Sequence, residues 1–382
     1  MSPHQRDDAG DLAGLNGFPG DVVEGAEVGG LGGSYGSAEQ DHGQREQDER
    51  RANAAGSVLA NHGLDLSRRP TRPEKIDILG DVPSTRRVFM TGATGFVGRA
   101  VIQALRAEGY AVRCLVRRGS ERDLRGLEAI ERVEGNVLAR ETLERGMAGC
   151  DTVIHLVGII REQAATLSTF ERIHVQGTIN VLDAAAGTGV RRYLHMSALG
   201  SRSNARSRYH QTKWAAEEAV RSNPVPWTIF RPSIIYGRGD EFVSLLAGMI
   251  QRYPVVPVIG GGLQRLQPVP REHVAAGFAR AVALDTTVKQ TYDVVGPDAV
   301  TLLRLLDLVG EALGRARVRK VHVPIGLVRP LARLLHRLPG FPLTPDQLLM
   351  LEEDNVGDPR PFYTTFGQSP MPLATGLRAM LG

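Results

Sequence analysis

Short apolar runs rich in β-branched residues alternate with longer segments of helical periodicity from Arg87 onward. This alternation is typical of a parallel β-sheet that is covered by helices on both faces. The pattern predicts strands at 87–90, 111–116, 132–134, 152–156, 192–197 and 227–231. It predicts helices between them at 96–108, 121–127, 141–148, 169–186 and 209–221. We therefore expect a six-stranded, doubly wound α/β sheet of the Rossmann type over residues 86–232.

The pattern changes on either side of this sheet. After residue 232 helical segments predominate, at 241–252, 272–284, 302–313, 327–338 and 345–353, with short strands such as 291–295 among them. They predict a smaller, mainly helical C-terminal lobe over residues 233–358. Four prolines in residues 359–382 favour an extended tail. Residues 1–85 are rich in Gly, Asp, Gln and Ser without a sustained apolar period, which predicts a disordered N-terminal tail.

Net charge also distinguishes residues 1–85 from the rest of the chain. Residues 1–85 carry 8 basic and 15 acidic side chains, a net charge of −7, whereas the whole chain carries +4, so residues 86–382 carry +11. A basic body suits an anionic ligand, but charge alone does not distinguish a dinucleotide from a nucleic acid or an anionic membrane surface. Residues 327–338 place arginines among leucines, and fit either a helix on an anionic surface or a helix packed on the lobe by its leucines. We favour the packed helix.

The cysteine content and the hydropathy exclude several classes of protein. Cys114 and Cys150 are the two cysteines, and both have apolar neighbours. This content is typical of a reduced intracellular protein, and it offers neither a disulfide framework nor a zinc-ligand spacing. The N-terminus has no basic segment followed by an apolar run, and no stretch approaches the ~18 consecutive apolar residues of a membrane span. We expect a cytoplasmic protein without a metal site.

The strongest local motif is Thr-Gly-Ala-Thr-Gly-Phe-Val-Gly at 91–98, which follows a predicted strand and opens a predicted helix. In this place Gly92 permits a tight turn, Gly95 lets backbone amides approach a pyrophosphate, and Gly98 lets the helix lie close to the sheet. The helix N-terminus favours the charge of the phosphates. The motif therefore predicts a dinucleotide site, against the alternative of a glycine-rich turn without function.

The end of the second predicted strand indicates which dinucleotide is bound. Folds that select NAD usually place an acid there to hold the ribose hydroxyls. Here the stretch after Val116 is Arg117, Arg118, Gly119 and Ser120. Two guanidinium groups can hold a 2′-phosphate by charge-assisted hydrogen bonds, so NADP(H) is favoured and NAD(H) is the second choice. The alternative is an exposed basic turn in an arginine-rich protein.

Tyr209 and Lys213 are a candidate catalytic pair. Four residues apart at the start of a predicted helix, they lie on one face, where the ammonium can lower the pKa of the phenol for general acid-base work. This spacing is common by chance, but the chain has only 4 lysines among its 46 basic residues. A lysine kept in so arginine-rich a chain favours the functional interpretation. Ser197, at the end of the fifth predicted strand, is the candidate for orienting a carbonyl, and it equally fits a polar strand end.

These motifs together resemble the short-chain dehydrogenase/reductase superfamily in its extended, epimerase-like form, from about Arg86 to Asp358. The closer likeness is to the atypical branch that contains the NAD(P)H-binding accessory subunit of respiratory complex I and its bacterial relatives. It rests on the sequence His-Leu-Val-Gly-Ile-Ile-Arg at 155–161 and on stretches at 173–178, 195–200, 231–240, 267–275 and 343–355. The resemblance implies that Tyr209 and Lys213 are the active-site pair and that Ser197 matches, or lies next to, the serine position.

The sequence departs from the active members of the superfamily in three places. His174 stands where they usually keep an asparagine that supports a proton-relay water, and Asn136 replaces an acid that meets the adenine. Ser197 lies between Met196 and Ala198, where epimerases usually have several hydroxyl residues. The resemblance therefore implies an accessory or regulatory module that binds NADP(H). The alternative is an active oxidoreductase or nucleotide-sugar epimerase that uses Tyr209 and Lys213.

These arguments give a defined set of expected contacts and partners. The expected cofactor-contacting residues are Gly92, Ala93, Thr94, Gly95, Phe96, Val97, Gly98, Arg117, Arg118, Asn136, Val137, Leu156, Val157, Gly158 and Lys213. By resemblance, the second expected partner is a respiratory or quinone-linked complex, with a peripheral location at the inner membrane surface. A basic protein that binds a membrane surface or nucleic acid is a third function class, although we expect no nucleic-acid partner. The sequence leaves the oligomeric state open.

Overall fold

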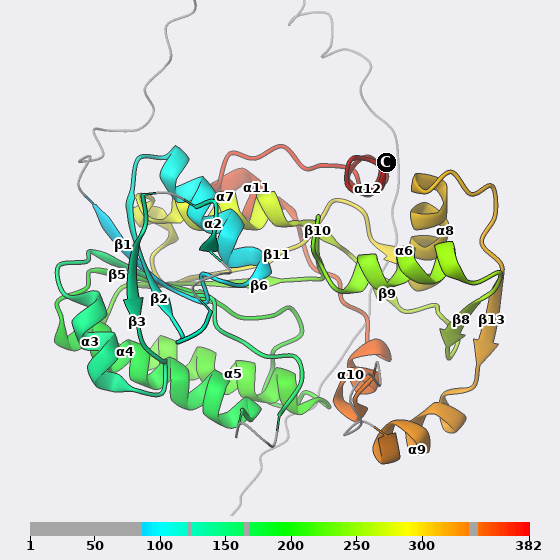
Figure 1. Cartoon of the computed structure of the whole chain (residues 1–382), viewed down its shortest axis with the longest axis horizontal. Helices are drawn as coiled ribbons and strands as arrows, with labels where there is room; N and C mark the ends of the chain where they lie inside the picture. Colours follow the sequence, from blue (N-terminus) through cyan, green and yellow to red (C-terminus); the bar gives the residue numbers. More distant parts are fainter. Residues whose placement is uncertain (1–85, 121–123, 128, 164–167, 336–342) are drawn as a thin grey trace, which may run out of the picture. The chain divides into compact units, whose positions relative to one another are not determined.

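Seven parallel strands form the central sheet, in the order β11-β6-β5-β4-β1-β2-β3 (Figure 1). The computed structural model describes residues 86–120, 124–127, 129–163, 168–335 and 343–382, and the predicted disordered tail at 1–85 lies outside them. The strands of the sheet are β1 (Arg87–Thr91), β2 (Ala111–Val116), β3 (Glu131–Glu134), β4 (Thr152–His155), β5 (Arg192–Met196), β6 (Trp227–Pro232) and β11 (Gln290–Val294). The predicted doubly wound α/β sheet is confirmed.

Strand β11 makes the sheet larger than the six strands predicted. The sequence pattern does predict a strand at 291–295, but places it in the C-terminal lobe. In the structure it pairs in parallel with β6, with Gln290 opposite Thr228 and Val294 opposite Pro232. The chain therefore leaves the sheet after β6, builds part of the lobe and returns. Local patterning detects a strand but not its partner, and that explains the error.

Helices cover both faces of the sheet (Figure 1). One face carries α2 (Phe96–Ala107), α7 (Arg271–Ala281) and α11 (Arg360–Thr365), and the other carries α3 (Arg140–Met147), α4 (Gly177–Gly187) and α5 (Arg208–Ser222). Strand β1 contributes to both cores, because Val88 and Met90 point into one and Phe89 into the other. A strand buried on both faces reads as a continuous apolar run, as β1 does.

A π-helical turn, η3 (Glu171–Gln176), precedes α4 within the predicted helix at 169–186. Such turns are rare and occur frequently at functional sites. It carries His174, whose side chain is buried. The predicted helix at 121–127 lies partly outside the described residues, and its described part, 124–127, forms a turn.

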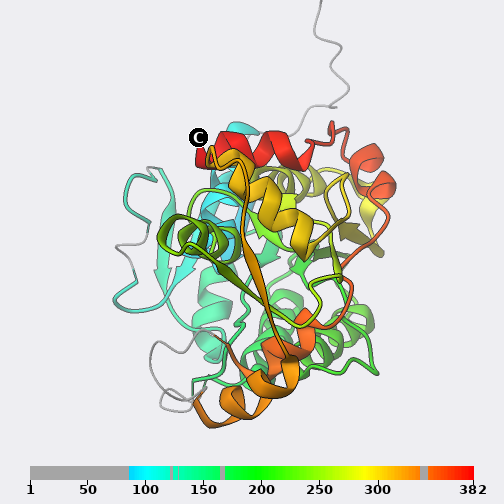
Figure 2. The same ribbon diagram turned by 90° about the vertical axis from the view of Figure 1, so that its right-hand side faces the viewer.

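The C-terminal lobe has a core of its own, formed largely by α6 (Phe242–Arg252), α8 (Leu302–Ala312) and α12 (Leu373–Leu381). Three two-stranded sheets accompany it, which pair β7 (Ile235–Tyr236) with β10 (Val269–Pro270), β8 (Val256–Ile259) with β13 (Lys320–Val323), and β9 (Arg265–Leu266) with β12 (Val300–Thr301). The 3-10 turn η4 (Asp285–Thr287) precedes β11. Strand β13 leads into α9 (Ile325–Leu335), which lies beside α10 (Pro345–Leu351) (Figure 2). None of the helices in the described ranges is long and apolar enough to cross a membrane.

The expected extended tail at 359–382 is wrong, because this segment forms α11 and α12. Phe362 and Phe366 of the α11 region are buried against Phe230 of the sheet. The prolines misled the sequence argument. Pro361 lies in the first turn of α11 and Pro372 immediately precedes α12, and a proline at a helix start costs no hydrogen bond.

Helix α9 also differs from its expectation. We expected it to pack by its leucines, but Leu327, Leu331 and Leu334 are exposed, and Ala332 is its one buried residue within the described part of the chain.

The start of α2 lies directly against the end of β1. Gly92 has a φ of 77°, in the left-handed region that favours glycine. A Cβ atom on Gly98 would lie 2.2 Å from the backbone oxygen of Gly92. The predicted roles of Gly92 in the turn and of Gly98 in close packing therefore follow from the geometry.

Replacing Gly98 by alanine is expected to lower the free energy of unfolding of the nucleotide-free protein by about 1–3 kcal/mol, because the backbone must shift to accommodate the methyl group. Chemical denaturation measures this change. Gly248 of α6 is the matched control, since it also lies within a helix but has open space around its Cβ position. Gly248→Ala is expected to raise the free energy of unfolding by about 0.5–1 kcal/mol. Equal shifts for the two variants would contradict the close contact.

Candidate nucleotide-binding site

A cleft of about 280 Å³ opens at the carboxyl ends of the strands. It lies where the strand order reverses, between β1 and β4, which is the usual ligand position in an open α/β sheet. The cleft is lined by Thr91, Gly92, Thr94, Gly95, Leu115, Arg117, Gly135, Asn136, Val137, Leu138, Leu156, Val157, Gly158, Ile159, Ser168 and Ile173. Nine of these are expected cofactor contacts: Gly92, Thr94, Gly95, Arg117, Asn136, Val137, Leu156, Val157 and Gly158.

The glycine-rich turn presents the N-terminus of α2 to this cleft. Gly95 is the residue before the helix, and no side chain caps the backbone amides of the first turn. The amide of Gly95 itself donates to the oxygen of Gly92 at 3.1 Å. The first amides of a helix have no partner within the helix, and they carry the positive end of its dipole. Both properties suit an anion such as a pyrophosphate. Ala93, Phe96, Val97 and Gly98 belong to the turn or the first turn of the helix but do not line the cleft.

Two arginines follow β2, and they differ in their position relative to the cleft. Arg117 lines the cleft, whereas Arg118 is exposed outside it. Neither side chain forms an ion pair within the described ranges. Asn136, after β3, accepts a hydrogen bond from the amide of Leu138 at 3.0 Å, so its side chain stabilises the loop that forms one wall.

A chain of buried polar groups lies behind the cleft. The Thr91 hydroxyl and His155 Nδ1 are 2.6 Å apart, and His155 Nε2 is 3.2 Å from the Thr178 hydroxyl. Thr178 donates to the backbone oxygen of His174 at 2.6 Å. Burial, with a smaller contribution from Lys213, lowers the pKa of His155 to about 3. His155 is therefore a neutral hydrogen-bonding residue at physiological pH.

His174 joins the cleft wall to α5. Its Nδ1 atom is 2.9 Å from the Thr212 hydroxyl, and its Nε2 atom accepts from the amide of Ile159 at 3.0 Å in one tautomer. Phe170 stacks on the ring, with centroids 5.4 Å apart. Burial, followed by the charge of Lys213, lowers the pKa of His174 to about 2. The residue at the expected asparagine position thus holds two elements together as a neutral ring.

Tyr209 lies beside His174, with ring centroids 5.4 Å apart and planes at 87°. Asp346 of α10 accepts hydrogen bonds from the amides of Arg208 and Tyr209, at 2.7 and 3.0 Å, and so caps α5. Burial, followed by the negative charge of Asp346, raises the pKa of Tyr209 to about 12. This shift is opposite to the lowering that general acid-base work by the phenol needs.

Lys213 and Ser197 both lie at the carboxyl end of β5 (Arg192–Met196). Lys213 is buried, and its ammonium donates to the backbone oxygen of Met196 at 2.6 Å. Burial lowers its pKa to about 8, and Glu217 opposes the shift. The Ser197 hydroxyl donates to Glu217 Oε1 at 2.5 Å. Neither residue, nor Tyr209, lines the cleft.

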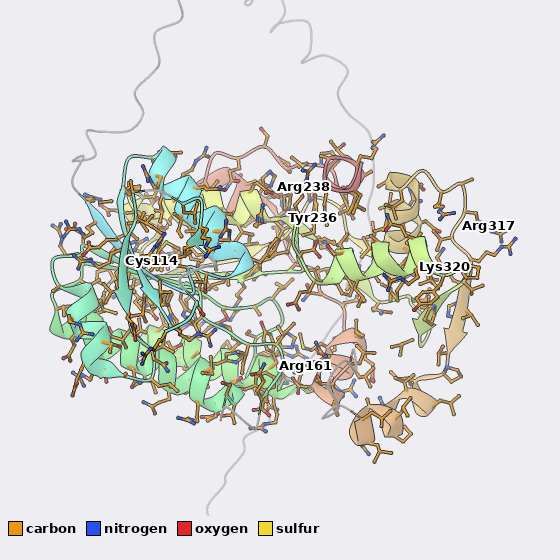
Figure 3. The ribbon with its side chains drawn as sticks, in the orientation of Figure 1. Cys114, Arg161, Tyr236, Arg238, Arg317 and Lys320 are labelled. Carbon is orange, nitrogen blue, oxygen red and sulfur yellow. The ribbon has the colours of Figure 1, made fainter. Side chains whose placement is uncertain are left out.

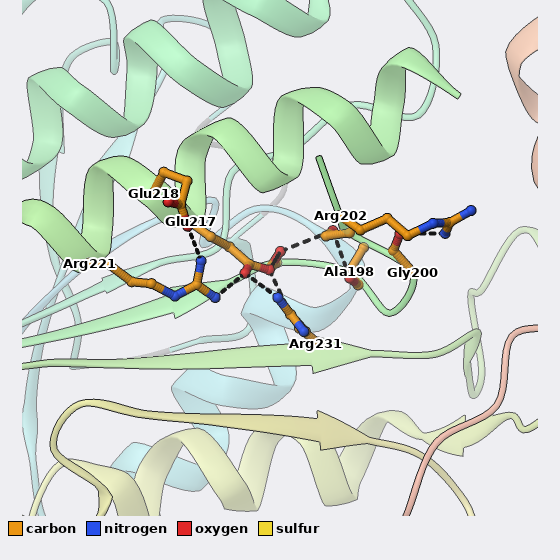
Figure 4. Close-up of polar contacts among 9 residues, drawn as sticks. Ala198, Gly200, Arg202, Glu217, Glu218, Arg221 and Arg231 are labelled. Atoms are coloured by element: carbon orange, nitrogen blue, oxygen red, sulfur yellow. Dashed lines mark hydrogen bonds and ion pairs between the residues drawn. The ribbon is translucent and has the colours of Figure 1, made fainter. Parts of the chain in front are cut away.

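Glu217 is the residue that the sequence argument missed. Its fully buried carboxylate accepts from Arg231 at 2.6 and 2.9 Å and from Arg221 at 2.5 Å, in addition to Ser197 (Figure 4). Two guanidinium groups compensate the cost of burying the charge. Its place four residues after Lys213, on the same helix face, was the available signal. Thr91, His155 and Ile159 were also missed as site residues, because Thr91 and His155 end buried strands and Ile159 takes part through its backbone, which no side chain reveals.

The buried histidines predict how stability depends on pH. In the unfolded chain histidine takes up a proton near pH 6.5, whereas folded His155 and His174 do so only near 3 and 2. Between these values the unfolded state binds more protons, so the free energy of unfolding falls as the pH falls. Replacing His174 by asparagine is expected to flatten this dependence below pH 6 by about 1.4 kcal/mol per pH unit, measured by denaturation across a pH series.

The matched control is His322→Asn, because His322 is exposed. It should leave the slope of stability against pH unchanged. Parallel slopes for the wild type and the His174 variant would contradict a neutral buried ring.

Comparison with known proteins agrees with this fold and cleft. The family model described as "NAD dependent epimerase/dehydratase family" matches residues 88–294. The chain is 31% identical over 279 residues to the NADH dehydrogenase 1 alpha subcomplex subunit 9 of Arabidopsis thaliana, covering 69% of this chain and 68% of that protein. It is 36% identical over 201 residues to the ceramide reductase of Caulobacter vibrioides, covering 52% of this chain and 61% of that protein, which is less than two thirds of its length.

Solved structures show the same fold. The UDP-glucose 4-epimerase of Thermotoga maritima superposes with a TM-score of 0.61 at 18% sequence identity, covering 78% of this chain and 97% of that one. At this identity the likeness shows the fold alone. Residues 88–294, which the family model matches, include the glycine-rich turn, the residues that line the cleft and helix α5. This chain belongs to the NAD-dependent epimerase/dehydratase family, as an atypical extended short-chain dehydrogenase/reductase.

Proposed function

We propose that this protein binds NADP(H) and acts chiefly as a cofactor-binding accessory or regulatory module. The observation that carries the proposal is the cleft at the strand-order reversal, which joins uncapped amides of α2 to the side chain of Arg117. Uncapped helix amides suit a pyrophosphate, and a guanidinium after β2 suits a 2′-phosphate. An acid in that position would repel the phosphate, and here both residues that follow β2 are arginines.

The residues that line the cleft and those in the first turn of α2 divide by chemistry. The amides of Phe96 and Val97 would hold the pyrophosphate, and Arg117 the 2′-phosphate. Asn136 and Val137 would flank the adenine side, and Leu156, Val157 and Gly158 would form the wall toward the nicotinamide. A bound nicotinamide dinucleotide would supply a hydride donor or acceptor at that wall.

Three features favour binding over turnover. The pKa of Tyr209 is raised to about 12, and the Ser197 hydroxyl is engaged by Glu217. His174, in the position of the usual relay asparagine, has both ring nitrogens committed to Thr212 and Ile159. Relatives named as subunits of NADH dehydrogenase make a respiratory complex the proposed partner.

The cofactor preference gives a direct test. NADPH is expected to bind more tightly than NADH, and Arg117→Ser is expected to weaken NADPH binding by roughly 10- to 100-fold while NADH binding changes little, because one charge-assisted contact is lost. Isothermal titration calorimetry of both nucleotides measures this. Arg118→Ser is the matched control, since the neighbouring side chain lies outside the cleft, and it should leave both affinities within a few-fold. Tighter binding of NADH, or no effect of Arg117→Ser, would defeat the proposal.

A second candidate is NADPH-dependent reduction of a lipophilic carbonyl compound. It is favoured by the retention of Tyr209 and Lys213 on one face of α5, and by the likeness to a protein named ceramide reductase. In this candidate function, the Tyr209 phenol would donate a proton to the substrate only when substrate and cofactor are both bound, since hydrogen bonds at active sites often tighten only in the complex.

Replacing Tyr209 by phenylalanine separates the two candidates. Under the binding proposal, NADPH oxidation with a 3-oxo-ceramide in mixed micelles, whose ketone can accept the hydride, stays at the protein-free rate for the wild type, for Tyr209→Phe and for the exposed control Tyr253→Phe. The reductase would be established instead if the wild type and Tyr253→Phe oxidise NADPH with this substrate and the rate falls by roughly 100-fold or more in Tyr209→Phe. NADPH titration of each variant checks that the cofactor is still bound.

A further inference from the structure

Helix α9 turns an apolar side to solvent. Leu327, Leu331 and Leu334 are 67%, 48% and 77% exposed, and their spacing of four and three residues puts them on one side of the helix. We call these three residues the α9 surface. Single exposed leucines are ordinary, but three on one side of one helix make a candidate interaction site.

The exposure is concentrated in this part of the molecule. Within the described ranges, eight of the nine exposed large hydrophobic residues lie between Leu245 and Leu334, and the ninth is Ile160. Val321, half exposed, belongs to β13, the strand that leads into α9 (Figures 1 and 2). The two cores beside the central sheet therefore expose few large apolar side chains, whereas the lobe has a buried core but also exposes most of the large apolar side chains that reach solvent.

Cationic side chains precede the same strand. Arg315, Arg317 and Arg319 are exposed in the connection between α8 and β13, and none forms an ion pair with another residue that the structure describes. The Arg317 side chain extends away from the ribbon (Figure 3). Residues 86–382 carry a net charge of +11. This arrangement complements a negatively charged surface.

An apolar helix side accompanied by cations matches one partner chemistry in particular. A nucleic acid would use the arginines but would leave three leucines in water. The described part of α9, Ile325–Leu335, does not meet the length of ~20 residues that a bilayer span needs, but it can lie in the interface with its leucines among the acyl chains. Arginines in the connection that leads into β13 then meet lipid phosphates.

The α9 surface is physically connected to the end of the molecule that carries Tyr209. Arg329 of α9 pairs with Glu352 at 2.6 and 2.8 Å, and Glu352 also pairs with Arg206 at 3.1 Å. Arg206 lies just before α5, whose first amides are capped by Asp346 of α10. A partner that binds α9 would therefore also influence the position of α10, because Arg329 of α9 pairs with Glu352 next to α10. Helix α10 in turn contacts the amide of Tyr209 through Asp346.

We propose that the α9 surface docks the protein on an anionic phospholipid membrane, with Leu327, Leu331 and Leu334 inserted at the acyl boundary and Arg315, Arg317 and Arg319 at the headgroup phosphates. This interaction goes beyond nucleotide binding and does not depend on it. It makes the protein peripheral to the membrane through its C-terminal lobe.

Vesicle sedimentation with the full chain tests the proposal. The protein is expected to bind vesicles that contain phosphatidylglycerol, to bind phosphatidylcholine vesicles weakly, and to dissociate as salt is raised. The triple variant Leu327→Gln, Leu331→Gln, Leu334→Gln is expected to bind phosphatidylglycerol vesicles at least roughly tenfold more weakly. The triple variant Arg315→Gln, Arg317→Gln, Arg319→Gln is expected to lose the preference for the anionic lipid.

A matched pair of single variants distinguishes binding through the α9 surface from nonspecific hydrophobic adsorption to the vesicles. Leu331 and Leu245 are both 48% exposed, but Leu245 lies on α6, which both ribbon views place away from α9 (Figures 1 and 2). Leu331→Gln should weaken vesicle binding, and Leu245→Gln should not. Unchanged NADPH titration and thermal unfolding show that each variant is folded.

Several outcomes overturn the proposal. They are no binding to anionic vesicles at low salt, equal binding by the wild type and the leucine variant, or equal binding to both lipids. Self-association that the leucine variant abolishes, without vesicle binding, would instead make this face an interface between copies of the chain. Cross-links from residues 1–85 to α9, without vesicle binding, would mean that the chain covers the face itself.

Discussion

The backbone contact between the end of β1 and the first turn of α2 determines where the other parts of the cleft can lie. Gly98 has no Cβ, so the helix can begin against the oxygen of Gly92. The same turn brings Gly92 against the backbone of Leu156 at the end of β4, with a Cβ position only 3.0 Å from the carbonyl carbon. Helix, first strand and fourth strand therefore meet at one point, which is the point where the strand order reverses. Unpaired amides, positive dipole and cleft all result from this contact.

Behind the cleft, hydrogen bonds between buried polar groups hold the strands and helices of the site in place. His155 and His174 are kept neutral by burial, and each bonds to a threonine. The Glu217 carboxyl group accepts hydrogen bonds from Arg221 and Arg231. Such networks rigidify a structure when every member is satisfied. In the proposed function this rigidity serves the cofactor, because a preformed cleft lowers the ordering cost of binding.

The sequence predicted the parts of the structure that local patterning controls. Strand β2 was predicted to the residue, since a mainly apolar run, interrupted only by Arg113, ends at Val116 before two arginines and a glycine. The turn at 91–98 was predicted because glycine spacing at a strand-to-helix junction has one geometric meaning. The pairing of β11 with β6 and the burial of Phe362 depend on contacts between distant segments, and no local pattern reports them. The engagement of Ser197 by Glu217 was missed for the same reason, since Ser197 and Arg231 reach Glu217 only in the fold, although Arg221 lies four residues after it on α5.

The account depends on a pyrophosphate resting against the first amides of α2. Hydrogen–deuterium exchange of the protein with and without saturating NADPH measures this contact directly. The account predicts slower exchange in the peptide that spans residues 91–98, with the largest change at the amides of Phe96 and Val97. Unchanged exchange in this peptide while NADPH is bound, with protection elsewhere in the molecule, would contradict it.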